Sequence, residues 1–298
     1  MEIRKSFDFK KALINLLSFL VWTILCPLFF AAFSPVASAE AFQAKVFPAK
    51  IHQGDAFMVR VSGLKGPTVP SATFNKGPLR FSSCGKGCFV ALGAVDLNAE
   101  PGAYRIPVKT GKRRTTLRLR VSKGEFETIN LTLPDDKVSP GPEAIERINR
   151  EAALLSLIWE IDSERLWQGV FVLPLANPLS TPFGTKRIIN GETVSIHRGL
   201  DMKGAEGEEI RATNTGRVVL TEELFFGGNT VILDHGQGIF TLYMHMSQFN
   251  VGPGDLVSKN DVLGFVGSTG RSSGPHLHFG VKVMGMNTDP VSITRLKL

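Results

Sequence analysis

Residues 274–280 read GPHLHFG, and this stretch indicates both a strand and a chemical site. His276 and His278 alternate with apolar residues, which is the period of a half-buried strand, so both imidazoles project from one face. At a rise of ~3.3 Å per residue, their Cα atoms lie roughly 6.6 Å apart. One ring can therefore hold a metal ion while the other faces bound water or substrate.

Three further residues of the last hundred are candidates for the same site. His197 and Asp201 lie four apart in HRGLD, and Gly199 between them argues against a regular helix. In an extended segment, positions i and i+4 still share a face. His245 lies in LYMHMS, where a regular strand places it on the same face as Tyr243.

Four histidines and one aspartate form a ligand set that suits Zn²⁺. The chain has six histidines in all, so four in one region at strand or turn spacings favour a shared site. A catalytic zinc keeps one coordination position open for water. The helical His-Glu-x-x-His signature of many zinc proteases is absent from the sequence. Each pair alone is a weak indication, but the combination predicts a zinc hydrolase.

Residues 180–290 resemble the lysostaphin-like (LytM-type) zinc endopeptidases, which cleave peptidoglycan. The similarity runs, in the family's order, through STPFGTKR, HRGLDM, GGNTVILDHGQG, VLGFVGSTGRSSGPHLHFGV and NTDPVS. The resemblance implies a groove over a small antiparallel sheet that takes an extended peptide. It also implies one zinc ion held by His197, Asp201 and His278, with His245 and His276 as the catalytic histidines.

The chemistry of imidazole fits these implied roles. A ring with a pKa near 6.5 can take a proton from a zinc-activated water and return one to the leaving amine, and a second ring can stabilise the oxyanion. The residues alone do not decide which histidine does which. We favour His276 as the base, because it lies two residues from a ligand.

Weaker candidates surround this centre. His235, in a turn beside Gly236, is more typical of a structural histidine than of a ligand. Lys186 and Arg187 could hold an acidic peptide, although solvated surface charges are more common. The residues expected along the substrate groove are Asn229, Tyr243, Ser272, Ser273 and Gly274.

Hydrophobic periodicity predicts a mostly β fold in three parts after the N-terminal segment. Residues 40–133 contain short runs separated by Gly and Pro turns, which predicts an immunoglobulin-like β-sandwich. Residues 134–169 predict a linker and a connecting helix, whose apolar stripe is expected to pack against a neighbouring domain. Residues 170–298 predict an antiparallel β-sheet metallopeptidase domain. The helix is expected over Pro142–Ile161, and its stripe consists of Ile145, Ile148, Ala152, Leu155 and Trp159.

Residues 1–39 predict an export signal. A basic start precedes an apolar run over residues 12–33, and Ala37-Ser38-Ala39 offers a cleavage site before Glu40. The apolar run also reaches the roughly 20 residues that a membrane-spanning helix needs, so retention as an inner-membrane anchor is the alternative. We favour cleavage. In either case the rest of the chain is expected in the periplasm or cell envelope.

Cys84 and Cys88 are the two cysteines beyond this segment. In an oxidising compartment the short loop between them favours a disulfide, with two free buried thiols as the alternative.

The charge of the chain limits its partners. Residues 1–39 contribute +2, so the chain without them carries +5 rather than +7. A mild excess of this kind favours an anionic polymer such as a cell wall. The sequence has no basic cluster with interleaved aromatic residues, which argues against nucleic acid. Nothing in it indicates an oligomeric state.

These observations predict an exported zinc metalloendopeptidase that hydrolyses peptide bonds in peptidoglycan stems or crossbridges. The alternatives are a catalytically silent or latent regulator of other wall hydrolases and a peptidoglycan-binding protein. The sequence does not show which peptide bond is cut.

Overall fold

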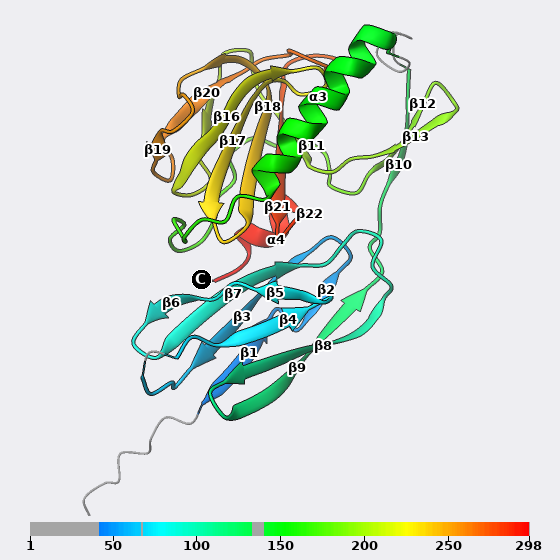
Figure 1. Cartoon of the computed structure of the whole chain (residues 1–298). Coiled ribbons are helices and arrows are strands. Elements are labelled where there is room, and N and C mark those ends of the chain that lie inside the picture. Colours follow the sequence, from blue (N-terminus) through cyan, green and yellow to red (C-terminus); the bar gives the residue numbers. More distant parts are fainter. Residues whose placement is uncertain (1–41, 67, 133–139, 298) are drawn as a thin grey trace, which may run out of the picture. The chain divides into compact units, whose positions relative to one another are not determined.

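The computed structural model describes residues 42–66, 68–132 and 140–297, and Figure 1 shows a mostly β chain, as the sequence predicts. The predicted export segment and the start of the linker lie outside the described residues. Among the described residues, no helix has the length and apolar character needed to cross a bilayer.

The N-terminal part is a sandwich of two sheets (Figure 1). Side chains such as Phe57 and Val59 from one sheet and Ile106 and Leu119 from the other are fully buried together in one core. The immunoglobulin-like strand order stays a prediction. The first sheet has the order β1 (Gln43–Phe47), β3 (Ala56–Ser62), β7 (Cys88–Ala94) and β6 (Ser82–Gly85). The second has the order β2 (Lys50–His52), β9 (Arg113–Ser122), β8 (Gly102–Thr110), β4 (Ser71–Phe74) and β5 (Gly77–Leu79). A disulfide joins Cys84 of β6 to Cys88 of β7.

Strand β10 (Thr128–Leu131) differs from the predicted arrangement. The expected sandwich extended to residue 133, but β10 pairs in parallel with β12 (Lys186–Ile189), which pairs with β13 (Thr193–Ile196). The ring of Phe126 covers Gly184, where a Cβ atom would collide with it. This contact holds the segment that leads into β10 against the β12–β13 hairpin. No local sequence pattern predicts it.

The C-terminal part is built on a large sheet in which every strand pair is antiparallel. The central order is β11 (Leu179–Thr181), β14 (Leu200–Lys203), β21 (His276–Val283), β18 (Ile239–Phe249), β17 (Gly228–Gly236), β16 (Gly216–Leu224) and β19 (Leu256–Val257). The remaining strands are β15 (Glu209–Arg211), β20 (Val262–Val266) and β22 (Met286–Thr288). Two helices accompany them, α3 (Pro142–Trp159) and the short α4 (Pro290–Thr294).

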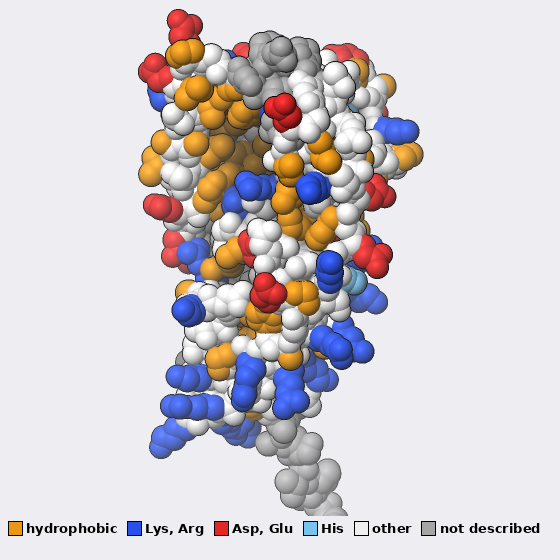
Figure 2. All heavy atoms as spheres, turned by 90° about the vertical axis from the view of Figure 1, so that its right-hand side faces the viewer, with side chains coloured by type: hydrophobic (Ala, Val, Ile, Leu, Met, Phe, Trp, Pro, Cys, Tyr) orange, Lys and Arg blue, Asp and Glu red, His pale blue; other side chains and the backbone are white. Residues whose placement is uncertain are grey.

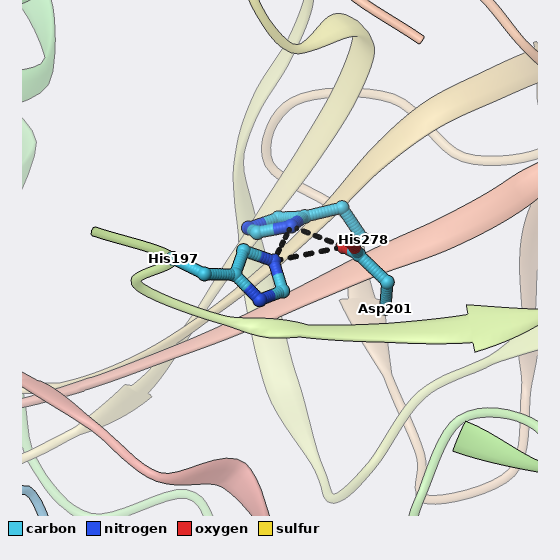
Figure 3. A group of neighbouring side chains, drawn as sticks. All are labelled: His197, Asp201 and His278. Carbon is cyan, nitrogen blue, oxygen red and sulfur yellow. Dashed lines mark hydrogen bonds and ion pairs between the residues drawn. The ribbon is translucent and has the colours of Figure 1, made fainter. Parts of the chain in front are cut away.

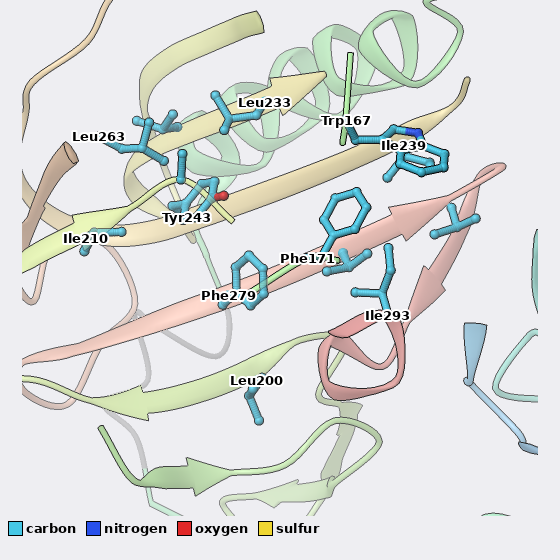
Figure 4. Packing of buried hydrophobic residues seen from close by; sticks show 14 of the residues in the cluster. Trp167, Phe171, Leu200, Ile210, Leu233, Ile239, Tyr243, Leu263, Phe279 and Ile293 are labelled. Carbon is cyan, nitrogen blue, oxygen red and sulfur yellow. The ribbon is translucent and has the colours of Figure 1, made fainter. Parts of the chain in front are cut away.

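One face of this sheet carries the main core, which contains Trp167 and Phe171 (Figure 4). Along β21, Leu277 and Phe279 point into this core, and they alternate with His276 and His278. The period of two predicted from the sequence is therefore present, and it leaves both histidines on the opposite face.

Helix α3 packs on that opposite face. Ile158 is buried there with Ile232 and Phe240, and Trp159 meets the ring of Phe240 edge to face at 5.3 Å. The predicted stripe is only partly used, because Ile145 remains 48% exposed. The helix thus packs against the C-terminal domain, as the sequence predicts, and covers the sheet beside the histidines.

Candidate metal and active site

Three donor atoms from separate parts of the chain meet at one point (Figure 3). His197 Nε2 lies 2.9 Å from Asp201 Oδ1 and 2.9 Å from His278 Nδ1. His278 Nδ1 lies 2.8 Å from the same carboxylate oxygen. This is the trio that the resemblance implied as metal ligands.

The chemistry of these atoms fits a bound cation. His197 Nδ1 donates to the carbonyl oxygen of Pro182 at 2.9 Å, which leaves Nε2, directed at the carboxylate of Asp201, as the ring nitrogen that would bind a metal ion. Tetrahedral zinc ligands at ~2.0–2.1 Å lie roughly 3.3 Å from one another, so small shifts suffice to admit the ion.

Strand pairing and one glycine create this convergence. In the β14–β21 ladder, Asp201 lies directly opposite His278 and Lys203 opposite His276. The HRGLD segment passes so close to β21 that a Cβ at Gly199 would lie 2.5 Å from His278 Nε2. Glycine at this position is therefore a packing requirement, which adds to its effect on helix formation.

Asp201 is a buried carboxylate with both oxygens engaged. Oδ2 accepts from Arg187 Nη2 at 2.7 Å, while Oδ1 faces the two imidazoles. Burial alone would raise its pKa, but hydrogen bonds with His197 and His278 hold the pKa well below its ordinary value. Burial lowers the pKa of His278. The trio therefore contains an anionic carboxylate, Asp201, and an imidazole, His278, that favours its neutral, metal-binding form.

His245 and His276 lie beside the trio with matching orientations. His245 Nδ1 donates to the carbonyl oxygen of Thr269 at 2.9 Å, and His276 Nδ1 donates to that of Gly274 at 2.8 Å. Their ring centroids are 4.7 Å apart, and His276 Nε2 lies 3.9 Å from Asp201 Oδ1. Because Nδ1 of each neutral ring carries the proton, Nε2 is left as a proton acceptor.

The position of His245 corrects the expectation that it shares a face with Tyr243. Residues Asn229 and Met246 are partners across the β17–β18 ladder, as are Val231 and Tyr243, so β18 has one extra residue between these pairs. This β-bulge includes His245, whose φ of 64° is in the left-handed region. The bulge turns the ring to the side of the metal trio, where it lies 6.1 Å from the ring of His278.

We expected Tyr243 to line the groove, but it does not. Its side chain is fully buried in the main core beside Phe279, and its hydroxyl accepts from the backbone of Thr213 at 3.1 Å and bonds to Thr241 Oγ1 at 3.0 Å. Burial raises its pKa. Tyr243 is on the regular part of β18, before the bulge, so it keeps the inward orientation that His245 loses.

Of the other expected groove residues, Ser272 and Gly274 contact His276. Ser272 Oγ lies 3.2 Å from His276 Nδ1 and donates to Gly274 O at 2.7 Å, so this loop orients the His276 ring. Ser273 is exposed. Asn229 donates to Ser247 O at 3.2 Å. None of these residues is among those that line the groove described next.

A groove of about 690 Å³ opens beside the metal trio and is lined in part by His197, His245 and His278. Figure 2 looks toward this side, where hydrophobic side chains surround a hollow. One wall is α3, and the other is the β12–β13 hairpin, whose Val194 and Ile196 are 57% and 38% exposed. Apolar wall residues include Ile148, Ala152, Leu155, Val194, Ile196, Leu224, Phe226 and Met244.

Arg271 is a half-buried cation of this groove. Its guanidinium stacks over the ring of Phe226 at 4.3 Å, and among the described residues it has no acidic partner. Burial and the nearby charge of Arg187 lower its pKa. Glu151, the acidic residue of the lining, already pairs with Arg147 at 2.7 Å. The guanidinium of Arg271 therefore remains available to pair with an acidic group.

The sequence alone does not indicate several of these contacts. It favours a solvated charge at Arg187 and carries no sign of a role for Arg271. The role of Arg187 follows from the β12–β13 pairing, and that of Arg271 follows from its contact with Phe226. No sequence motif predicts either contact. His235 is structural, as predicted: the buried ring contacts Thr215 O and Thr241 Oγ1, each at 2.8 Å.

Comparison with known proteins agrees with this geometry. Residues 195–290 match the sequence profile of peptidase family M23. The chain carries an M23 peptidase domain. A protein of Pseudomonas aeruginosa assigned to peptidase M23 has a solved structure that matches with a TM-score of 0.65 and 29% identity. The match covers 81% of this chain and 94% of that protein, so it extends well beyond the M23 domain.

Three curated relatives are similar to part of this chain. The DD-carboxypeptidase/endopeptidase Mpg of Neisseria meningitidis is 38% identical over 115 residues, which are 39% of this chain and 26% of the relative. The peptidoglycan DD-endopeptidase ShyA of Vibrio cholerae is 37% identical over 92 residues, 31% of this chain and 21% of the relative. Lysostaphin of Staphylococcus staphylolyticus is 39% identical over 93 residues, 30% and 19% of the two chains. The chain thus spans about a quarter or less of these relatives.

Proposed function

We propose that this chain is an exported zinc metalloendopeptidase that hydrolyses peptide bonds in the stems or crossbridges of bacterial peptidoglycan. The observation that carries the proposal is the meeting of three metal-donor atoms with two further imidazoles at the side of one groove. The names of Mpg and ShyA, which specify carboxypeptidase and endopeptidase activity, support the reaction and substrate class.

The metal is assigned to His197, Asp201 and His278. Two imidazoles and one carboxylate match a catalytic zinc with three protein ligands and an open position. When bound, zinc polarises the scissile carbonyl and brings the pKa of a coordinated water toward neutrality. Arg187 fixes the orientation of the carboxylate by its bond to Oδ2, which leaves Oδ1 for the metal.

His276 and His245 move the protons. His276 Nε2 is next to the donor trio and accepts the proton of the attacking water, and the resulting imidazolium returns it to the leaving amine. Burial, with the charge of His276, lowers the pKa of His245 to about 4, which favours its neutral ring near neutral pH. We assign to His245 the contact with the oxyanion, which its Nε2 makes as a donor once that nitrogen carries a proton.

The groove suits a peptide with small apolar side chains and a free carboxylate. Its two walls are apolar, and Arg271, which stacks on Phe226, offers a cation without an acidic partner among the described residues. Stem peptides of peptidoglycan are rich in alanine and carry free carboxylates, so both features have a counterpart in this substrate.

The site is proposed to act outside the cytoplasm, in the periplasm or cell envelope. The predicted export signal in residues 1–39 supports this placement, and the apolar run 12–33 allows anchoring in the inner membrane if it is retained. The peptidoglycan peptide is the one partner that we propose for the groove.

The test uses the chain from Glu40 onward, loaded with zinc and incubated with purified sacculi. We expect one zinc per chain and loss of sacculus turbidity, both abolished by His197→Ala. Zinc binding without any hydrolysis of sacculi or of isolated stem peptides would instead identify a wall-binding or regulatory protein.

A further inference from the structure

The positive charge of the chain is concentrated in the sandwich. Residues 42–132 contain 15 Lys and Arg against five Asp and Glu, a net charge of +10, whereas the whole chain has +7. The rest of the chain is therefore net negative. In Figure 2, Lys and Arg side chains gather toward the lower end of the molecule, over the sandwich. A charge imbalance of this size within one chain indicates a surface with its own partner.

These charges lie together on the outer face of one sheet. In the β8–β9 ladder, Arg105 lies opposite Arg118 and Lys109 opposite Arg114. In the neighbouring β2–β9 ladder, Lys50 lies opposite Arg120. Residues between them, such as Ile106 and Leu119, point into the sandwich core, so all six cations point outward, and all are exposed. We call Lys50, Arg105, Lys109, Arg114, Arg118 and Arg120 the basic face.

No acidic side chain balances the basic face. The other outward residues of β2, β4, β8 and β9 include no Asp or Glu, and none of the six cations has an ion pair among the described residues. Like charges directly opposite each other across a ladder destabilise a sheet. An anionic partner removes this repulsion, so binding it also stabilises the sheet.

The form of the basic face selects among anionic partners. It is the surface of a five-stranded sheet, and the outward positions of β2, β4, β8 and β9 hold no Phe, Tyr or Trp. Readers of single-stranded nucleic acid stack bases on such rings, so this partner class is disfavoured. A broad surface of cations without rings suits a broad surface of anions, such as the headgroups of a bilayer.

The length of chain between the predicted apolar run and the sandwich argues for a membrane as this partner. The apolar run 12–33 is followed by only eight residues before Phe42, and eight residues span at most roughly 29 Å. Export carries the run through a membrane, and retention would hold the sandwich beside it. We propose that the basic face binds the anionic headgroups of a phospholipid bilayer. This role goes beyond the peptidase function and does not depend on it.

The experiment measures binding to vesicles with the chain from Glu40, since its residues from Phe42 onward belong to one compact unit. Vesicles contain phosphatidylcholine with or without 30% phosphatidylglycerol, roughly the anionic content of a charged leaflet. The test variant combines R105Q, R118Q and R120Q. A matched control combines K65Q, K76Q and K86Q, which removes three exposed cations of the sandwich outside the basic face. Melting curves check that both variants are folded.

We expect the unaltered chain and the control to bind the anionic vesicles in low salt and to be released by high salt. Each cation near an anionic surface strengthens binding about fivefold. The test variant lacks three of them, so it should bind roughly 100-fold more weakly. Equal binding by the two triple variants would overturn the proposal. So would failure of the unaltered chain to bind, or tighter binding to an anionic polysaccharide or to DNA than to the vesicles.

Discussion

Arg187 holds Oδ2 of Asp201 at 2.7 Å, while Oδ1 of the same carboxylate faces His197 and His278. A cation on the adjacent β12–β13 hairpin thus orients the carboxylate through the oxygen that does not face the two imidazoles. Groups that orient a ligand in this way typically account for 10- to 100-fold in metal affinity.

The first prediction concerns Arg187. Replacement Arg187→Met keeps the length of the side chain and removes the hydrogen bond, so zinc affinity should fall by roughly 10- to 100-fold. Competition with a chromogenic chelator measures the affinity. Lys186→Gln removes the same charge one residue away, at an exposed position, and should leave the affinity unchanged. Equal effects of the two changes would show that only the overall charge matters.

The second prediction separates proton transfer from metal binding. His276→Ala should lower kcat by roughly 10²- to 10⁴-fold while most of the zinc remains, because Nε2 of this ring lies 3.9 Å from the nearest oxygen of the metal trio. His278→Ala should lose the zinc itself. Metal analysis beside stem-peptide hydrolysis distinguishes these outcomes. If His276→Ala loses as much zinc as His278→Ala, the assignment of the two residues is reversed.

The third prediction concerns the carboxylate site in the groove. Arg271→Gln should raise KM by roughly 10-fold or more for a stem peptide with free carboxylates, since a charge-assisted hydrogen bond is lost. For the amidated peptide KM should change little. Arg198→Gln, which alters an exposed arginine of the same groove lining, is the control. An equal rise in KM for both peptides would mean that Arg271 only shapes the groove.

The fourth prediction concerns stability and pH. Burial lowers the pKa of His235 to about 4, whereas the unfolded chain has the ordinary value of 6.5. Below 6.5 the unfolded state binds the proton and the folded state does not, so stability is present above 6.5 and is lost as the pH falls toward 4. His235 alone should account for roughly 3 kcal/mol of this loss.

Urea denaturation at several pH values measures the effect. His235→Gln should flatten the fall in unfolding free energy between pH 6.5 and 4. His52→Gln, at an exposed strand end, serves as the control and should keep the slope. A slope that survives in His235→Gln would locate the pH dependence elsewhere in the chain.

The fifth prediction tests the placement of Tyr243 in the core. Tyr243→Phe leaves the buried backbone N–H of Thr213 without its acceptor, so the unfolding free energy should fall by about 1–3 kcal/mol. The KM for a stem peptide should stay the same. Tyr104→Phe removes a hydroxyl that donates to Glu100 O at an exposed site, and it should cost less. A large rise in KM for Tyr243→Phe would instead show that Tyr243 contacts the substrate in the groove.

The sequence predicts the period-two strand of His276 and His278 because alternation decides which face a side chain occupies. The same rule fails at His245, where the bulge adds one residue and reverses the face. Such a bulge depends on pairing with β17 and on the loop that supplies the carbonyl of Thr269. Neither is encoded near His245 in the sequence.

The partition of the chain shows the same limit. Turn residues and alternation locate the strands of the sandwich, but β10 joins β12 through a parallel pairing of residues more than fifty positions apart. Arg187 contacts Asp201 for a related reason, since the hairpin that carries it folds back over β14. Long-range pairing, unlike local period, leaves little trace in a single sequence.

The central claim is that the metal trio and the two catalytic histidines hydrolyse peptide bonds of peptidoglycan. Mass analysis of the fragments that the zinc-loaded chain releases from sacculi of defined chemistry tests it most directly. We predict peptide fragments with new amino and carboxyl ends, each cleavage adding one water, and none with His197→Ala or Asp201→Ala. Release of the same fragments by these two variants, or intact sacculi after incubation with the zinc-loaded chain, would contradict the claim.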